Sequence, residues 1–204
     1  MLLLLCACTG PFTQRERLII GRSQIPMYVT TVEADSAFLR TPSADFGPAE
    51  LASPLLDTLI TKMMGTLRHP SQDGVGIAAP QVGISRRIII VKRYDKSDGP
   101  FEVFVNVKID SLLGSVVCGP EGCLSVPGLR GVVPRSERVV VSYYDRALGE
   151  RVSEHVDGYT AIIFQHECDH LDGILYIDRA DTVFVNEAWL EERAAFDYSK
   201  PEWW

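Results

Sequence analysis

The chain has 204 residues, of which 46% are hydrophobic and 23% charged, a composition typical of one globular domain with a sizeable core. Its formal net charge is −7 and no block of Lys or Arg stands out, which argues against direct nucleic-acid binding. No apolar run approaches the roughly 18 residues that a membrane-spanning helix requires, so we expect no transmembrane segment.

Residues 1–27 lack clear periodicity, and we expect them to form an N-terminal extension outside the core. The chain begins MLLLLCACTG, but no positive charge precedes this short apolar stretch, so a signal segment is disfavoured. We therefore predict a cytoplasmic protein of bacterial type. A lipoprotein-like start at Leu5-Cys6-Ala7-Cys8 is the less favoured alternative.

The five cysteines follow neither the spacing of a disulfide framework nor a CxxC pattern. We interpret Cys118 and Cys168 as small buried hydrophobic residues. Cys123 has a different sequence context, between a glycine and a proline-containing turn.

The first clear helical pattern begins at Ser53, which can cap a helix whose first turn accepts Pro54. Apolar residues then recur on one helical face: Leu55, Leu56, Leu59, Ile60, Met63, Met64 and Leu67. The helix should end before His69-Pro70, because proline disfavours helical geometry in the residue that precedes it. We expect the apolar face to pack into the core.

The next segment, Gly74–Gln81, fits the GxGxxA pattern of dinucleotide-binding proteins. We reject that interpretation because a helix precedes the glycines where a strand is required, and Pro80 and Gly83 would interrupt the following helix. We interpret the segment as a loop or strand whose small residues admit a substrate backbone. Gln81 could then donate a hydrogen bond to a developing oxyanion.

Four extended runs follow and predict strands: residues 87–94, 101–110, 138–145 and 151–156. Residues 146–150 can join the last two as a hairpin. A helical pattern covers residues 159–171 and closes at Gly173.

A last short helix is predicted over residues 186–196, capped by Asn186, with Trp189 and Phe196 on one face. The order of elements indicates an α+β fold, with mainly antiparallel sheets packed around a central metal-binding helix and with a C-terminal helix. We divide the chain into the extension, a metallohydrolase domain over residues 28–182, and a C-terminal helix and tail over residues 183–204.

The central helix contains the motif HExxH, in which His166 and His170 are four residues apart. Residues at this spacing lie on one helical face, so both imidazoles can bind one ion, while Glu167 can reach a water beside it. An exposed amphipathic helix would explain the histidines without a metal. The helix is apolar around much of its circumference, however, which indicates burial and a need for partners.

A catalytic metal site requires a third protein ligand and an open position. The metzincin continuation fails because its last position is Tyr176. A thermolysin-like scheme would use a glutamate of the acidic last helix: Glu187, Glu191 or Glu192. Cys123 is the better candidate, because neighbouring glycine and proline indicate a specially shaped loop and a thiolate binds borderline-soft divalent ions well.

Three segments together resemble the peptide deformylase family, whose pattern is GxGxAAxQ, then EGCxS, then QHExDHLxG. They are Gly74–Gln81, Glu121–Ser125 and Gln165–Gly173, in the same order. The resemblance extends from about Tyr28 to Asp181.

The resemblance implies a hydrolase that removes the N-formyl group from the initiator methionine of nascent chains and releases formate. It implies Cys123, His166 and His170 as metal ligands and Glu167 as general base and acid. The other implied roles are oxyanion stabilisation by Gln81 and the backbone N–H of Leu124, and substrate contacts by Val75, Gly76, Gly122 and Arg130.

The implied cofactor is one divalent ion. Ligand chemistry alone favours zinc, whereas the resemblance places Fe(II) first, with Zn(II), Ni(II) and Co(II) as alternatives. The implied partner is an N-formylmethionyl peptide, met in transient proximity to the ribosome, although the acidic tail does not favour docking through a basic helix.

Three alternatives stay open on the sequence. A zinc peptidase would use a downstream acid and be indifferent to Cys123. A purely structural metal site would need a fourth ligand such as His155 or Cys168, and a deformylase-like protein could have lost its activity.

Overall fold

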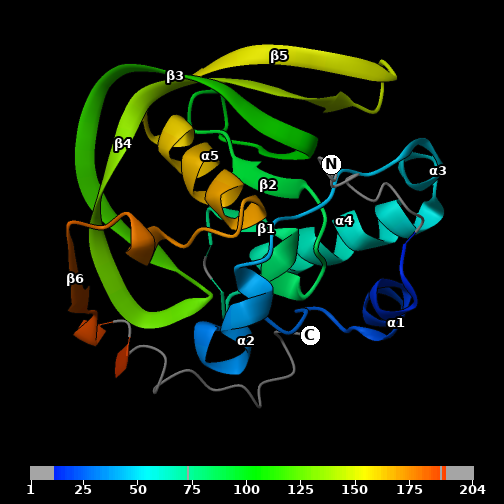
Figure 1. Cartoon of the computed structure of the whole chain (residues 1–204), viewed down its shortest axis with the longest axis horizontal. Helices are drawn as coiled ribbons and strands as arrows, with labels where there is room; N and C mark the ends of the chain where they lie inside the picture. Colours follow the sequence, from blue (N-terminus) through cyan, green and yellow to red (C-terminus); the bar gives the residue numbers. More distant parts are fainter. Residues whose placement is uncertain (1–11, 73, 189, 192–204) are drawn as a thin grey trace, which may run out of the picture.

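The computed structural model describes residues 12–72, 74–188 and 190–191. An antiparallel sheet arches over one central helix, α5 (Gly158–Leu171), as Figure 1 shows. The strands are β1 (Gly76–Ala78), β2 (Ile88–Lys92), β3 (Phe101–Cys123), β4 (Val126–Asp145), β5 (Glu150–Asp157) and β6 (Thr182–Val185). Their order is β1-β2-β3-β4-β5, and β6 pairs with β4. The predicted α+β class and its antiparallel sheet are confirmed.

The remaining helices are α1 (Gln14–Arg22), α2 (Val32–Leu39), α3 (Pro48–Leu51) and α4 (Pro54–Leu67), with 3₁₀ turns η1 (Ala79–Val82) and η2 (Tyr176–Asp178). Helix α4 has the predicted limits. The Ser53 side chain accepts the N–H of Leu55, and the helix ends at Leu67, before the predicted His69-Pro70 boundary.

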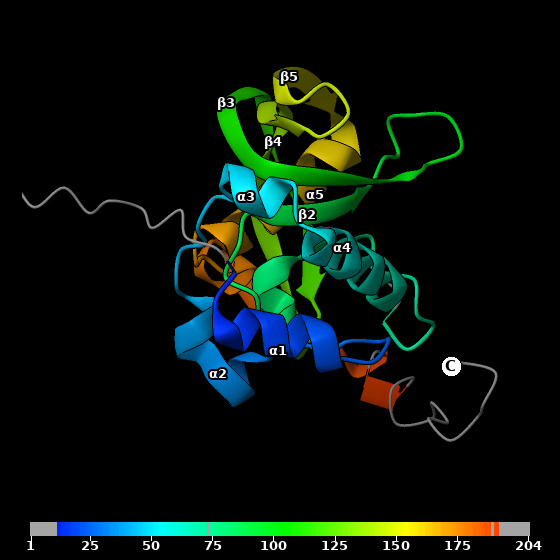
Figure 2. The same cartoon turned by 90° about the vertical axis from the view of Figure 1, so that its right-hand side faces the viewer.

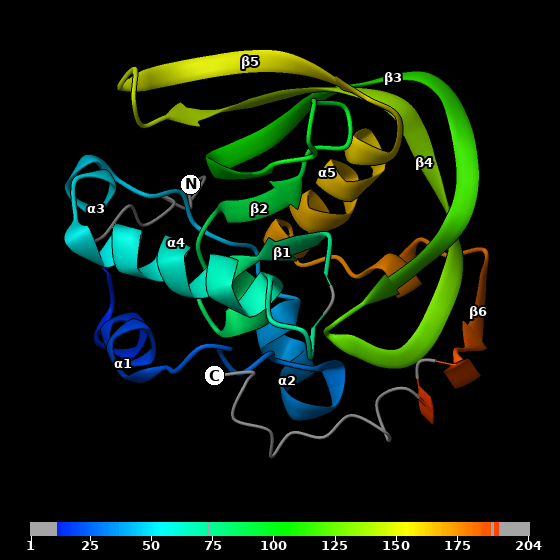
Figure 3. The same ribbon diagram turned by 180° about the vertical axis from the view of Figure 1, so that it is seen from behind.

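Strand β2 is buried on both faces and joins two parts of the core. Ile88 and Ile90 pack in the cluster that contains the apolar face of α4, while Ile89 and Val91 pack with α5. A strand covered on both sides has a continuous apolar sequence, as β2 does. Figure 3 shows α5 enclosed by the arch of β3 and β4, on the far side of β2 from α4.

The predicted strand over residues 101–110 is too short, because β3 continues to Cys123. After its pairing with β2 over Phe101–Val105, β3 is held by β4 alone, with register shifts along the way. Most side chains of residues 111–120 are exposed on both faces, so this part of the strand has no apolar alternation to reveal it. For the same reason Cys118 is exposed and our interpretation of it as a buried hydrophobic residue is wrong, whereas Cys168 is buried with α5 as predicted.

The expectation that residues 1–27 lie outside the core is wrong for the part that the structure describes. Thr13 caps α1, and Phe12, Ile20 and Met27 are buried in the same cluster as α4. Figure 2 shows α1 lying alongside α4. The sequence did not reveal this helix because its polar residues include Glu16, which is itself buried in an ion pair with Arg86.

The C-terminal helix begins where predicted. Residues 187, 188, 190 and 191 are helical, and the N–H of Leu190 donates to the carbonyl of Asn186. Trp189, Phe196 and the rest of the tail lie outside the described residues, as do Cys6 and Cys8. Among the helices that the structure describes, none has the length and apolar character needed to cross a membrane.

Candidate metal centre

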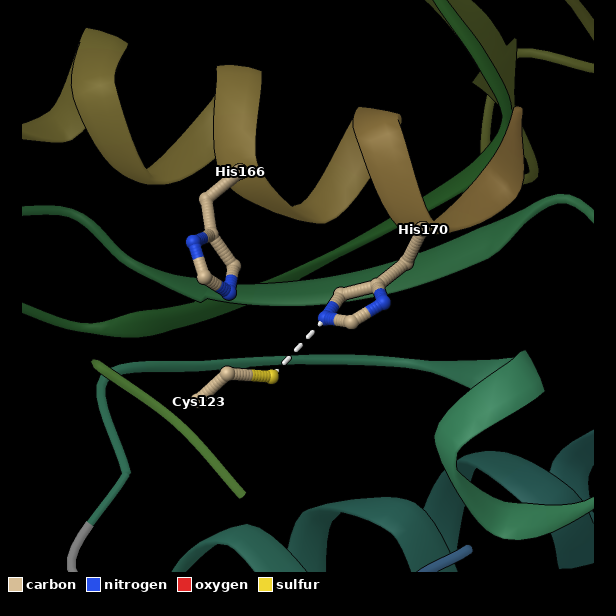
Figure 4. A group of neighbouring side chains, drawn as sticks. All are labelled: Cys123, His166 and His170. Atoms are coloured by element: carbon tan, nitrogen blue, oxygen red, sulfur yellow. Dashed lines mark hydrogen bonds between the residues drawn. The ribbon is translucent and has the colours of Figure 1, made fainter. Parts of the chain in front are cut away.

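Three side chains from two distant segments meet beneath helix α5. His166 and His170 project from one face of the helix toward the side chain of Cys123, as Figure 4 shows. The ligand atoms of the three residues all lie within 4.8 Å of one another, and Cys123 Sγ is 3.2 Å from His170 Nε2. The i, i+4 spacing therefore places both imidazoles as predicted, and the fold brings Cys123 to them.

Cys123 is the last residue of β3, not part of an irregular loop as the sequence suggested. The strand pairing shifts register between Gly122 and Cys123, and Cys123 then pairs with Val126 across the turn at Leu124 and Ser125. This shift re-aims one side chain at the end of a hairpin, a common use of an irregular strand pairing. The thiol thus has a rigid support on β3 and β4.

The donor set fits a divalent metal ion. Burial raises the pKa of the Cys123 thiol, but His170 and His166 outweigh burial and hold that pKa well below its usual value. A thiolate and two imidazoles suit a borderline-soft divalent ion, and three ligands leave one position open for a catalytic water.

His166 is oriented by a buried carboxylate. Glu121 Oε2 lies 2.8 Å from His166 Nδ1, which leaves the other ring nitrogen for the metal. Arg135 donates to both oxygens of Glu121 at 2.7 and 3.0 Å, and to Asp169 at 2.6 Å. Burial raises the pKa of Glu121, but the bonds from His166 and Arg135 outweigh it and lower the pKa to about 2.

Glu167 lies beside the ligands with an uncommitted carboxylate. It is 4% exposed, and its Oε2 atom has no hydrogen-bond partner among the described residues. Burial raises its pKa to about 7, an effect that His166 and His170 only partly offset. A carboxyl group whose pKa lies near neutrality can both accept and return a proton.

Gln81 is held so that its amide NH₂ faces the site. The N–H of Ala78 donates to Gln81 Oε1 at 2.8 Å, and Gln81 Nε2 lies 3.5 Å from Cys123 Sγ. Since the carbonyl end of the side chain is occupied, the donor end is directed at the metal centre.

One cavity of about 680 Å³ contains the proposed substrate-binding surface. Its lining includes every substrate-contact residue predicted from the sequence and the oxyanion candidates: Val75, Gly76, Gly122, Arg130, Gln81 and Leu124. Glu167 and His166 lie in the same lining, so the cavity opens directly onto the metal centre.

Comparisons with known proteins agree on one family. The family model described as Polypeptide deformylase matches residues 29–184. The chain belongs to the peptide deformylase family. The peptide deformylase of Leptospira biflexa is 38% identical over 148 residues, which are 69% of this chain and 81% of that protein. The peptide deformylase of Symbiobacterium thermophilum is 49% identical over 146 residues, which are 67% of this chain and 66% of that protein.

Solved structures of deformylases have the same fold. The actinonin-bound class I type b peptide deformylase from Acinetobacter baumannii is 40% identical, with a TM-score of 0.67 over 78% of this chain and 100% of its own. The peptide deformylase from Thermotoga maritima is 34% identical, with a TM-score of 0.66 over 76% of this chain and 99% of its own. The predicted enzyme class is therefore confirmed: a metal-dependent hydrolase of protein biosynthesis that acts on the N-formyl amide of nascent chains.

The alternative metal ligands that the sequence offered do not lie with Cys123, His166 and His170 in this deformylase site. His155 is exposed on β5, Glu187 and Glu191 are exposed after β6, and Cys168 is buried in the core away from the histidines. Glu192 lies outside the described residues. The metal-binding group found among the described residues is Cys123, His166 and His170.

Sequence reasoning missed several residues of the deformylase site. The sequence assigned no function to Glu121, although this residue belongs to the EGCxS segment. Nothing near Arg135 in the sequence indicated that Arg135 would contact Glu121. Tyr159, Ile162, Ile163 and Asn186 also line the cavity. The helical spacing of Tyr159 and Ile163 from Glu167 could have indicated these two positions on the histidine helix. Asn186 comes from a segment whose position depends on β6 pairing with β4.

Proposed function

We propose that the chain removes the N-formyl group from the initiator methionine with Cys123, His166 and His170 holding one divalent ion and Glu167 transferring the proton. The observation that carries this assignment is the approach of three ligand atoms within 4.8 Å of one another, beside a buried carboxylate. Burial and an uncommitted oxygen suit Glu167 to proton transfer and leave it outside the ligand set.

A divalent ion held by these ligands would activate a water as a nucleophile at neutral pH and polarise the formyl oxygen. Glu167 takes one proton from the attacking water as the water oxygen bonds to the formyl carbon. Glu167 then gives this proton to the amide nitrogen, the C–N bond breaks, and formate and a free amine are released.

Gln81 and the N–H of Leu124 stabilise the negative charge that develops on the formyl oxygen. Donors that are fixed before the reaction stabilise this charge without having to reorganise, and losing one such donor costs on the order of 10²–10³ in kcat. The bond from Ala78 to the Gln81 carbonyl supports this role, because it fixes which end of the amide faces the site.

Small residues let the substrate backbone approach closely. Gly76 lies against Glu167, where a Cβ atom would collide with the carboxylate, and Gly122 faces Arg130 across the β3–β4 pair. We assign Val75, Gly76, Gly122 and Arg130 to binding of an N-formylmethionyl peptide in the cavity, where Arg130 is exposed at the edge.

For the metal we propose Fe(II), with Zn(II), Ni(II) and Co(II) able to occupy the same ligands. One thiolate and two imidazoles can bind all four ions, so the ligands alone do not select one of them. The resemblance to the family favours Fe(II) among the four. Because N-formylmethionyl chains arise at bacterial ribosomes, we place the enzyme in the bacterial cytoplasm, in transient proximity to the ribosome.

The test is formate release from a formyl-Met peptide by anaerobically purified protein, with metal content measured on the same sample. We expect about one metal ion per chain and turnover that Glu167→Gln abolishes with the metal retained. Cys123→Ala should lose both, whereas the matched variant Cys118→Ala, at an exposed thiol, should keep both. Formate release that survives Cys123→Ala, or cleavage of internal peptide bonds in its place, would refute the assignment and favour a peptidase.

A further inference from the structure

Helix α1 precedes the part of the chain that the family model matches, yet it is built into the core. The match begins at residue 29, whereas α1 covers Gln14–Arg22 and contributes the fully buried Ile20. Thr13 and Glu16 form reciprocal capping bonds that fix the start of the helix. The location of α1 therefore has to be explained by this chain's own contacts.

Besides its packing against α4, helix α1 makes a buried ion pair with the segment that follows Gln81. Glu16 accepts from Arg86 Nε at 2.8 Å and from a terminal nitrogen at 3.1 Å, and the two side chains are 8% and 5% exposed. Arg86 also pairs with Glu50 at 2.8 Å and lies over the rings of Phe12 and Phe46. Breaking a buried pair by removing one charge is strongly destabilising, so Arg86 is firmly held.

Arg86 lies four residues after η1, the 3₁₀ turn that contains Gln81. The turn ends at Gly83, which has φ +80°, and the N–H of Ile84 returns to the carbonyl of Ala79 at 3.1 Å. Ile19 of α1 packs against Gly83, within 3.4 Å of where a Cβ atom would stand. On the other side, the backbone N–H of Thr30 donates to the backbone carbonyl of Gln81 at 2.7 Å. The turn is thus held between α1 and the chain that follows α1.

The turn controls where the Gln81 amide points. The side-chain carbonyl of Gln81 accepts a hydrogen bond from the N–H of Ala78, three residues earlier, and this bond depends on the spacing that η1 imposes. A change in the turn would shift this bond and move the donor nitrogen, which lies 3.5 Å from Cys123 Sγ.

We infer that Glu16 is a positioning residue for the reaction: by its ion pair with Arg86 it fixes the turn that aims the Gln81 amide at the metal centre. This inference rests on the oxyanion role proposed for Gln81. Burial raises the pKa of Glu16, but the bonds from Arg86 and Thr13 outweigh it and hold the pKa below its usual value, so the carboxylate is charged at neutral pH.

The variant that tests this is Glu16→Gln, compared with Glu154→Gln. Glu154 lies on β5, and its loss weakens another ion-pair network, the one around the buried Arg93 that follows β2. We expect Glu16→Gln to lower kcat on the order of tenfold, less than the loss of an oxyanion donor itself, with KM and metal content unchanged. Glu154→Gln should leave kcat unchanged at a comparable loss of thermal stability. A drop in kcat that tracks stability in both variants would overturn the inference.

Two further measurements separate positioning from general destabilisation. Amide hydrogen exchange at Ala78 reports the bond to Gln81 directly, and Glu16→Gln should speed it while Glu154→Gln does not. In a Gln81→Ala background, Glu16→Gln should cause no further loss of kcat, because residues that act through one another are not additive. Additive losses, or unchanged exchange at Ala78, would refute the role of Glu16.

Should Glu16→Gln fail to fold, Ile19→Ala removes the contact with Gly83 and keeps the ion pair, and faster exchange at Ala78 is again expected. Unchanged exchange in that variant counts against the inference. If the metal-loaded wild type released no formate, the proposed function would fail, but exchange at Ala78 would still decide whether α1 fixes the Gln81 side chain.

Discussion

Gly76→Ala should displace the carboxylate of Glu167, to which we assign proton transfer, without removing any functional group. A Cβ atom at this position would lie 2.9 Å from both Cγ and Cδ of Glu167, and closer still to the carboxylate oxygen. Ordinary van der Waals contact begins near 3.4 Å, so the Glu167 side chain must retreat by about 0.5 Å or more. The backbone of Gly76 does not require glycine, because its φ lies outside the left-handed region.

The size of the effect follows from how strictly catalysis depends on geometry. A misplacement of about 1 Å can cost about 10²-fold in rate, so we expect kcat to fall by about ten- to a hundredfold. This is about 1.4–2.7 kcal/mol of activation free energy. Stability should change little, since the backbone at Gly76 accepts alanine and the lower entropy of the unfolded chain offsets the cost of moving Glu167.

The assay is formate release under saturating peptide, with metal content and thermal unfolding measured on the same preparations. Gly119→Ala is the matched control, because a Cβ atom there meets nothing within 4 Å. We expect Gly119→Ala to be indistinguishable from wild type. Full activity in Gly76→Ala, or a loss explained entirely by missing metal, would refute the reasoning that this glycine makes room for Glu167.

Three further predictions concern the metal ligands and the cavity. Glu121→Gln removes the charge that orients His166 and should weaken metal affinity on the order of 10–100-fold, measured by competition with a chelator; unchanged affinity in a folded variant would contradict this. The pKa of Glu121 is about 2 in the folded protein, against an ordinary value of 4.5, so its stabilising contribution is complete above pH 4.5 and is lost as the pH falls toward 2. Urea unfolding at pH 7 and pH 3 should show about 2 kcal/mol of this loss, and Glu121→Gln should reduce the difference. Arg130→Ala should raise KM for a formylated tripeptide with little change in kcat, and an equal loss in kcat would move Arg130 from binding to the chemical step.

The local parts of this protein could be predicted from its sequence. The helix with its Ser53 cap, and the placement of His166 and His170 on one face, follow from the helical period alone. Cys123 could be chosen as the third ligand from the chemistry of thiolates, before its distance from the histidines was known. The resemblance to deformylases rested on three motifs of the same local kind.

The tertiary structure decided what depends on distant partners. Strand β3 extends to Cys123 only because β4 pairs with it, and Cys118 is exposed because that pair stands clear of the core. Arg135 reaches Glu121, and Arg86 reaches Glu16, over separations in the chain that no periodic pattern connects. A charged residue that is buried cannot be told from an exposed one in the sequence, because only the fold determines whether an oppositely charged side chain lies next to it.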